Sequence, residues 1–220
     1  MGIIDSGLRA IFKRMEERVR DNAESEEQRK ERRRIRTIET LMGFPKDLQR
    51  TCLGKADALG NKLRRTDAWR KLQQAAAVPG IRIIVLAGPA GTGKTLAAAL
   101  WLAQQAQEQD GHAMWLPSPD LDIQADWKEP YLMARSRRAL VLDDIGVEEM
   151  RGARRAEKLL YHRYVERRMT ICTTNLIAAI FHRTYDDRIW SRLGEHGRWM
   201  RCEEVVRPDH GELPKEGARR

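Results

Sequence analysis

The chain contains the stretch Gly88-Pro89-Ala90-Gly91-Thr92-Gly93-Lys94-Thr95. It matches the pattern G-x-x-x-x-G-K-[ST] at every constrained position. An apolar run at residues 81–87 precedes it and an alanine- and leucine-rich run at 96–102 follows it, so we expect a strand, a glycine turn and a helix. In that order the backbone amides at the start of the helix converge on a phosphate group. The stretch therefore predicts a phosphate-binding loop for a nucleoside triphosphate; a glycine-rich turn that matches by chance is the weaker interpretation.

Two side chains of this loop predict its cofactors. Lys94 is expected to reach the β- and γ-phosphates, and the Thr95 hydroxyl is expected to ligate Mg²⁺. We therefore expect the chain to bind ATP together with Mg²⁺.

A second acidic motif follows an apolar run further along the chain. Residues 139–142 are all apolar, and Asp143 and Asp144 come directly after them. A buried parallel strand that ends in acid points its carboxylates into the ligand crevice. We expect Asp143 to hold the Mg²⁺ shell and Asp144 to orient the attacking water. An ordinary Asp-Asp turn is the alternative, and the upstream phosphate loop favours the site.

The remaining pattern predicts alternating strands and helices. After the phosphate-loop helix we expect a strand at 112–116, a short helix within 121–138, a helix at 153–168, a strand at 169–175, a helix around 186–193 and a last short strand at 198–206.

Composition limits the class of protein. A length of 220 residues suits one α/β domain with an appendage. The net charge of +9 favours a polyanionic partner, nucleic acid first, although a basic surface that binds nothing remains open. The three cysteines are scattered with no C-x-x-C pair, which fits a reducing cytoplasm and argues against disulfide or zinc frameworks. No apolar run approaches the roughly 18 residues that would span a membrane.

Three regions are expected along the chain. Residues 1–75 form a helical, charged region for binding a partner, 76–206 form the nucleotide-binding core and 207–220 form a flexible tail. Within the first region, residues 1–21 have the spacing of an amphipathic helix. Its apolar stripe buries either against the chain's own core or in a groove of a partner protein, and the sequence leaves both open.

Four motifs in this order resemble those of the AAA+ ATPases: 88–95, 139–144, 169–175 and 188–193. Within that superfamily, the amino-acid sequence of residues 142–146, 163–164 and 170–176 is similar to that of the DnaC/IstB group. The resemblance covers roughly residues 80–206. It implies an α/β AAA+ P-loop NTPase core, in which helices flank a five-stranded parallel sheet. The appendage at residues 1–75 matches that group only in being small and helical. No helical C-terminal lid is expected, because only about 27 residues follow residue 193, and this absence also resembles the group.

The resemblance also implies roles for single residues. Asn175 matches the sensor 1 residue, which lies between the γ-phosphate and the attacking water. Arg192 matches the arginine finger that acts on ATP held by the neighbouring subunit of a homo-oligomer. Arg188 competes for this role from the same helix face, and a salt bridge to a nearby acid is the structural alternative for either. Asp144 departs from the Glu of most AAA+ proteins and has the shorter side chain.

Three functions fit these features. The first is an ATP-dependent, cytoplasmic helicase loader that binds a replicative helicase and single-stranded DNA. The second is an IstB-like transposition helper on duplex DNA, and the third is a DNA-binding regulator that uses nucleotide as a switch. The basic side chains expected to contact DNA phosphates are Arg135, Arg137, Arg138, Arg154, Arg155 and Lys158.

Overall fold

The structure is a computed structural model that describes residues 28–30, 48, 66–108, 112–123 and 128–204. The amphipathic helix expected at 1–21 and the tail expected at 207–220 lie outside the described residues. Most of the helical segment expected before residue 76 also lies outside them.

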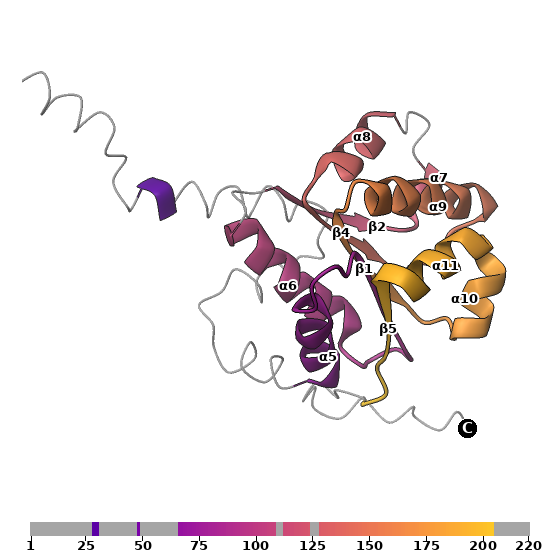
Figure 1. Cartoon of the computed structure of the whole chain (residues 1–220), viewed down its shortest axis with the longest axis horizontal. Coiled ribbons are helices and arrows are strands. Elements are labelled where there is room, and N and C mark those ends of the chain that lie inside the picture. The colour runs from indigo at the N-terminus through magenta and orange to yellow at the C-terminus, as the bar shows by residue number, and fades with distance from the viewer. Residues whose placement is uncertain (1–27, 31–47, 49–65, 109–111, 124–127, 205–220) are drawn as a thin grey trace, which may run out of the picture.

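A five-stranded parallel sheet forms the centre of the molecule (Figure 1). All neighbouring strands pair in parallel, in the order β2-β3-β4-β1-β5. The expected five-stranded parallel sheet is therefore confirmed, with strand ends that differ by a few residues from the sequence pattern. The strands are β1 (Ile83–Ala87), β2 (Ala113–Pro117), β3 (Ala139–Asp143), β4 (Met169–Thr174) and β5 (Gly197–Arg201).

The helices lie on both faces of this sheet (Figure 1). The chain crosses from β1 to β2 in one direction along the sheet and returns through β3 and β4 to β5 in the other. Because crossovers between parallel strands are right-handed, this reversal places the first helix and the later helices on opposite faces. The helices are α5 (Asp67–Ala76), α6 (Lys94–Glu108), α7 (Asp120–Ile123), α8 (Lys128–Ser136), α9 (Met150–Val165), α10 (Ala178–Thr184) and α11 (Asp187–His196).

The number of helices differs from the sequence expectation at two places in the chain. The segment 121–138 contains parts of two helices, α7 and α8, where one short helix was expected. Helix α10 was not expected at all, because its seven residues are too few to show a helical period.

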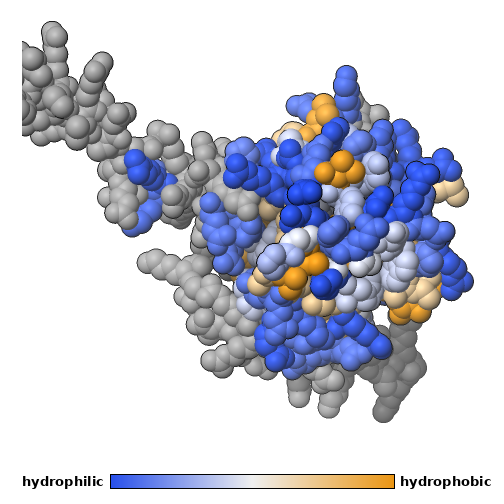
Figure 2. Space-filling view, viewed as in Figure 1, coloured by the Kyte–Doolittle hydropathy of each residue, from blue (hydrophilic) through white to orange (hydrophobic). Residues whose placement is uncertain are grey.

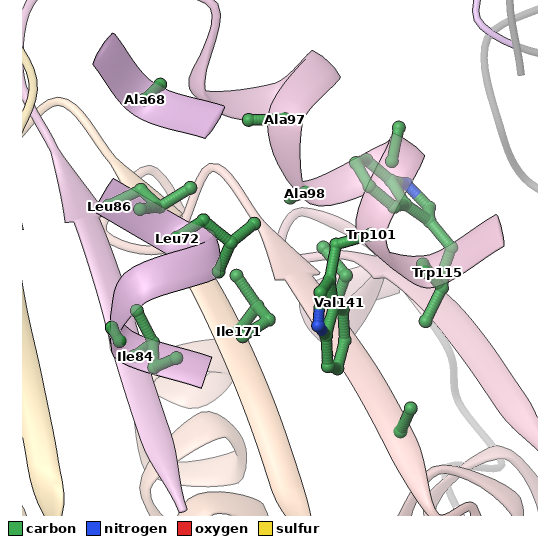
Figure 3. Packing of buried hydrophobic residues seen from close by; sticks show 14 of the residues in the cluster. Ala68, Leu72, Ile84, Leu86, Ala97, Ala98, Trp101, Trp115, Val141 and Ile171 are labelled. Carbon is green, nitrogen blue, oxygen red and sulfur yellow. The ribbon is translucent and has the colours of Figure 1, made fainter. Parts of the chain in front are cut away.

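Helices α5 and α6 cover one face of the sheet. Figure 3 shows Trp101 of α6 beside Trp115 of β2, with Val141 and Ile171 of the sheet close by. Leu72 of α5 is fully buried in the same cluster. Most of the α6 contacts come from alanines, so the helix axis approaches the strands closely.

Helix α5 belongs to this packed body. Thr66 caps its N-terminus by accepting a hydrogen bond from the Trp69 amide at 3.2 Å. Ala68, Leu72 and Ala75 then fall on one helical face and are buried against the sheet. The packed body thus includes residues that the sequence pattern assigned to the appendage. The division of the whole chain into three regions stays a prediction.

The opposite face of the sheet is covered by α7 to α11 and contains a buried guanidinium. Arg163 of α9 has no exposed surface. It donates to the carbonyl oxygens of Ala134 at 2.6 Å, Arg137 at 2.7 Å and Met169 at 2.6 Å, and to Thr170 Oγ1 at 2.8 Å. Burial lowers the pKa of Arg163 to about 9, so it remains charged at neutral pH. One side chain therefore joins the end of α8 to α9 and the start of β4.

The surface is mainly hydrophilic, as the face drawn in Figure 2 shows, with hydrophobic residues in separate small patches. Within the described ranges, each helix is too short or too polar to cross a bilayer.

Arg163→Leu is expected to lower the free energy of unfolding by about 3 kcal/mol, because the carbonyl oxygens it satisfies would remain buried without a donor. Urea denaturation followed by circular dichroism measures this change. Arg154→Leu, at an exposed position of the same helix, is the matched control and should change stability by less than about 0.5 kcal/mol. Equal effects of the two substitutions would contradict the role assigned to Arg163.

Candidate functional site

The carboxyl ends of β1, β3 and β4 meet at one edge of the sheet. The phosphate loop follows β1, Asp143 ends β3, and Asn175 follows β4. In the parallel register Ala87 pairs with Thr174, so the loop starts beside the strand that leads to Asn175. The structure therefore brings together three motifs that are distant in the sequence, with Lys94 and Asn175 81 positions apart.

The phosphate loop wraps around the start of α6. Gly88 lies against the backbone of residue 202, where an added Cβ would come within 2.0 Å of the Cys202 carbonyl oxygen. Gly91 and Gly93 have φ angles of 81° and 76°, in the left-handed region that glycine adopts without strain. Thr92 is buried and its hydroxyl donates to the Pro89 carbonyl at 3.0 Å, which closes the turn. This conformation turns the first amides of α6 toward the loop, as anion binding requires.

Lys94 lies across the loop that precedes it. Its Nζ donates to the carbonyl oxygens of Gly88 and Pro89, both at 2.8 Å, and to Asn175 Oδ1 at 3.0 Å. Burial lowers the pKa of Lys94, while nearby acidic groups, Asp144 and Asp143 among them, oppose that shift. The ammonium group is thus held between the phosphate loop and the predicted sensor asparagine.

Asp143 is a buried carboxylate with two hydroxyl partners. Thr173 Oγ1 donates to its Oδ1 at 2.6 Å, and Thr95 hydrogen-bonds to the same carboxylate. Burial raises the pKa of Asp143 to about 6, and the hydrogen bonds from Thr173 and Thr95 reduce the shift. Thr95 and Asp143, the two predicted Mg²⁺ ligands, are therefore neighbours. Both offer oxygen donors, which Mg²⁺ prefers.

Asp144 begins a turn with an unusual backbone. Its φ is 55°, a left-handed conformation that costs a non-glycine residue about 1 kcal/mol. Two contacts hold it there: its amide donates to Thr173 Oγ1 at 2.9 Å, and its carbonyl accepts from Ser118 Oγ at 2.7 Å. Thr173 thus positions both acids, since its hydroxyl donates to Asp143 and accepts from Asp144.

The sequence interpretation did not give Thr173 or Ser118 a role. Ser118 follows β2, and its amide donates to the Asp143 carbonyl at 2.8 Å, next to the acidic turn. Both hydroxyls sit where the neighbouring strands β2 and β4 end beside β3. Polar residues at strand ends of a predicted parallel sheet are therefore the signal that would have found them.

The two candidate arginine fingers lie on α11, away from the phosphate loop of their own chain. The end of α11 lies at the amino edge of the sheet, because the His196 carbonyl accepts from the Arg82 amide at 2.7 Å just before β1 begins. Arg192 Nη1 contacts Glu195 Oε2 at 3.1 Å, and its guanidinium lies 5.0 Å from the Tyr164 ring centre. Arg188 is exposed near the other end of the helix. The salt-bridge alternative therefore holds for Arg192 within one subunit.

The six basic residues expected to contact DNA are divided between two places. Arg154, Arg155 and Lys158 line a groove of about 920 Å³ between α8 and α9. Arg135 is paired with Glu166, and residues 137–138 lie at the amino end of β3. The groove also includes Lys128, Tyr131, Leu132, Glu149, Met150 and Arg151.

The fold and this arrangement define the class: the chain has the P-loop NTPase fold of the AAA+ type. No known protein family matches the sequence. No curated protein sequence matches it either.

Several solved structures share this fold. DnaI aligns with a TM-score of 0.55 and 20% identity over 76% of this chain and 94% of DnaI. A protein described as a primosome component from Streptococcus pyogenes serotype M3 aligns with a TM-score of 0.54 and 22% identity, over 75% of this chain and 92% of that protein. AMPPCP-bound DnaA from Aquifex aeolicus aligns with a TM-score of 0.51 and 21% identity, and the match spans 70% of this chain but only 50% of DnaA. The AAA+ P-loop fold that the resemblance implies is thus confirmed.

Without Mg²⁺, stability is expected to fall as pH rises through the pKa of Asp143. That pKa is about 6 in the folded chain, above the ordinary value of 3.8, so the folded state holds the proton more tightly than the unfolded state between these pH values. Asp143→Asn removes the titration and keeps an acceptor for Thr173. The variant should gain stability relative to the native chain between pH 4 and 7, by at most about 3 kcal/mol.

Urea denaturation of both proteins in chelator across this pH range tests the expectation. A stability difference between them that does not change with pH would contradict the buried, proton-binding state of Asp143. Asp120→Asn, at a partly exposed acid in the first turn of α7, is the control and should show no comparable trend.

Proposed function

We propose that the chain is an ATPase that loads a replicative helicase onto single-stranded DNA. The observation that carries the ATPase part is the contact between Lys94 Nζ and Asn175 Oδ1 at 3.0 Å, beside the acids that end β3. A phosphate-loop lysine, a neutral amide and two carboxylates then surround the position of a terminal phosphate. This is the set of groups that phosphoryl transfer to water uses.

Each residue has one role in this proposal. The amides of residues 88–95 bind the phosphates, and Lys94 leaves its carbonyl partners to contact the β- and γ-oxygens. Thr95 and Asp143 hold Mg²⁺, which when bound neutralises charge on the phosphate oxygens. Asp144 orients the attacking water and accepts its proton, and Asn175 donates a hydrogen bond to the γ-phosphate or the water.

The arginine finger acts between subunits in this proposal. The end of α11 and the phosphate loop lie at opposite edges of the sheet, and β1 alone spans roughly 16 Å between them. Arg192 is therefore far from its own nucleotide site, and a second subunit brings it to a neighbouring one. Its contact with Glu195 at the surface breaks when the subunits assemble.

The loading function rests on the fold and on charge. DnaI and the primosome component have the same fold at low identity. The groove between α8 and α9 places several cations around Tyr131 and apolar side chains, a combination that suits the backbone and the bases of a single strand. The N-terminal region, residues 1–75, is the part proposed to bind the helicase.

Mixing two inactive variants tests the ATPase and its arrangement between subunits. Lys94→Ala and Arg192→Ala are each expected to lower kcat by about 10³-fold, since one loses the phosphate contact and the other the finger. A 1:1 mixture should recover on the order of a quarter of the native rate, because a heterologous contact pairs an intact lysine with an intact arginine at one site in four. Steady-state phosphate release measures this.

Arg183→Ala, at an exposed arginine of α10, is the matched control and should keep the native rate. If Arg188→Ala complements Lys94→Ala and Arg192→Ala retains activity, Arg188 is the finger. A native chain that releases phosphate no faster than buffer would overturn the ATPase and would favour the nucleotide-switched regulator.

Removing two groove cations is expected to weaken DNA binding. The double variant Arg154→Ala/Lys158→Ala should reduce affinity for a single strand, and the slope of log Kd against log salt should fall by about 1.4, since roughly 0.7 counterions are released per phosphate contact. Fluorescence anisotropy with a labelled oligonucleotide measures both. Arg183→Ala again serves as the control, and unchanged affinity of the double variant would place the DNA elsewhere.

Partner capture separates the loader from the transposition helper. The full-length chain, expressed with the replicative helicase of its source, should co-purify with it and lose it when residues 1–36 are removed. Filaments on duplex DNA, with no affinity for the helicase, would select the transposition helper instead.

A further inference from the structure

The side chain of Glu148 lies behind the acidic turn and accepts hydrogen bonds from three directions. Gly146 donates its amide at 2.7 Å, Ser118 lies with its hydroxyl at 2.7 Å, and the Tyr185 hydroxyl makes a short contact to the other carboxylate oxygen. The sequence motifs give this residue no role. Glu148 is half-buried, and its partners come from the end of β2, the end of α10 and its own turn. We call this contact of three segments at one carboxylate the Glu148 junction.

The first consequence of this junction is a fixed backbone at Asp144. The turn that starts with Asp144, at a φ of 55°, continues through Gly146, at a φ of 103°. Both residues need the left-handed region, so the turn keeps its form only while its neighbours hold it. Glu148 holds the far end through the Gly146 amide. Ser118 Oγ lies 2.7 Å from both the Asp144 carbonyl oxygen and Glu148 Oε2, and these two acceptors share its single hydrogen, so the hydroxyl links the two ends of the turn.

The second consequence concerns the helix that carries the arginines. Tyr185 is almost fully buried between α10 and α11, and Asp186, the N-terminal cap of α11, follows it directly. Burial and the adjacent Glu148 carboxylate raise the pKa of Tyr185, so its hydroxyl keeps the proton that it donates. The Phe181 ring packs against the tyrosine, with 4.5 Å between the ring centres.

We propose that Glu148 is a positioning residue for hydrolysis: its carboxylate sets the turn that carries Asp144 and joins that turn to Tyr185 at the base of α11. This role rests on the proposed ATPase function. The residue touches neither nucleotide nor water. It fixes the direction of the Asp144 carboxylate and the start of α11, the helix that carries Arg188 and Arg192. Glu148 therefore positions both the water-orienting acid of one subunit's site and the arginine helix that reaches the next subunit's site.

A carboxylate suits this position because it can accept from all three partners: the Gly146 amide can only donate, and the Ser118 and Tyr185 hydroxyls each have one hydrogen to donate. Glutamine replaces one acceptor oxygen with an NH₂ group. If that group faces Gly146, the contact to the amide is lost; if it faces Tyr185, the tyrosine oxygen has to accept and its buried hydroxyl hydrogen loses its acceptor. Aspartate keeps the charge but is one carbon shorter, and it cannot reach all three partners at once. The two substitutions therefore separate charge from geometry.

The test is the split between kcat and KM for ATP hydrolysis by the full-length chain. Glu148→Gln is expected to lower kcat by about 10- to 100-fold, since small displacements of a water-orienting group have effects of this size. KM, and the affinity for a fluorescent ATP analogue, should change by less than about threefold, because Lys94 and Thr95 are not displaced. Tyr185→Phe should act in the same direction, and Glu148→Asp should not restore the native kcat.

The double variant Glu148→Gln/Tyr185→Phe should be no slower than the slower single variant, since both substitutions disrupt the same contact between residues 148 and 185. Glu108→Gln, at an exposed residue of α6, and Tyr161→Phe, at a tyrosine that is 41% exposed, are the matched controls and should keep native kcat and KM. Circular dichroism confirms that each variant is folded at the assay temperature. If Glu148→Gln does not fold, Tyr185→Phe alone decides the outcome.

Two results would overturn the proposal while the ATPase itself stands: native kcat in a folded Glu148→Gln or Tyr185→Phe variant, or a loss that appears in nucleotide affinity and not in kcat. A native chain that does not hydrolyse ATP overturns the proposed function and this role with it. The native arm of the experiment separates these cases.

Discussion

The site depends on the place of β1 between β4 and β5. This strand leads into the phosphate loop, and its parallel register sets Ala87 beside Thr174 and Ile83 beside Gly197. The first pairing puts Lys94 within reach of Asn175. The pairing of Ile83 with Gly197 places the end of α11 at the opposite, amino edge of the sheet, because α11 leads directly into β5 and β5 starts next to the start of β1. A single strand position thus decides both which groups meet within a subunit and which groups have to come from another one.

Much of the fold follows from local features of the sequence. Strands β1, β2 and β3 are short apolar runs that end at glycine, proline or acid, and such runs indicate buried parallel strands once a phosphate loop is present. The residues Lys94, Asp143 and Asn175 could be placed at one edge because parallel strands all end on the same side. Here sequence spacing was sufficient, since the geometry is that of strand ends rather than of individual side chains.

The groups that support the site were beyond this reasoning. Glu148 and Tyr185 are 37 positions apart, so no local period relates them, and neither of them directly follows a strand. Arg163 is one of several basic residues in α9, so its sequence context predicts a charge at the surface, although the side chain is completely buried. Burial of a charge depends on carbonyl oxygens that only the folded chain gathers.

The clamp around Arg163 has a further consequence for the groove beside it. All but one of its hydrogen bonds end on main-chain oxygens, including those of residues 134 and 137 at the end of α8. Every amino acid carries such an oxygen. The outward-facing side chains of α8 can therefore be exchanged for others without loosening the attachment of the helix, so one wall of the groove can acquire a new ligand preference while the architecture beneath it stays the same.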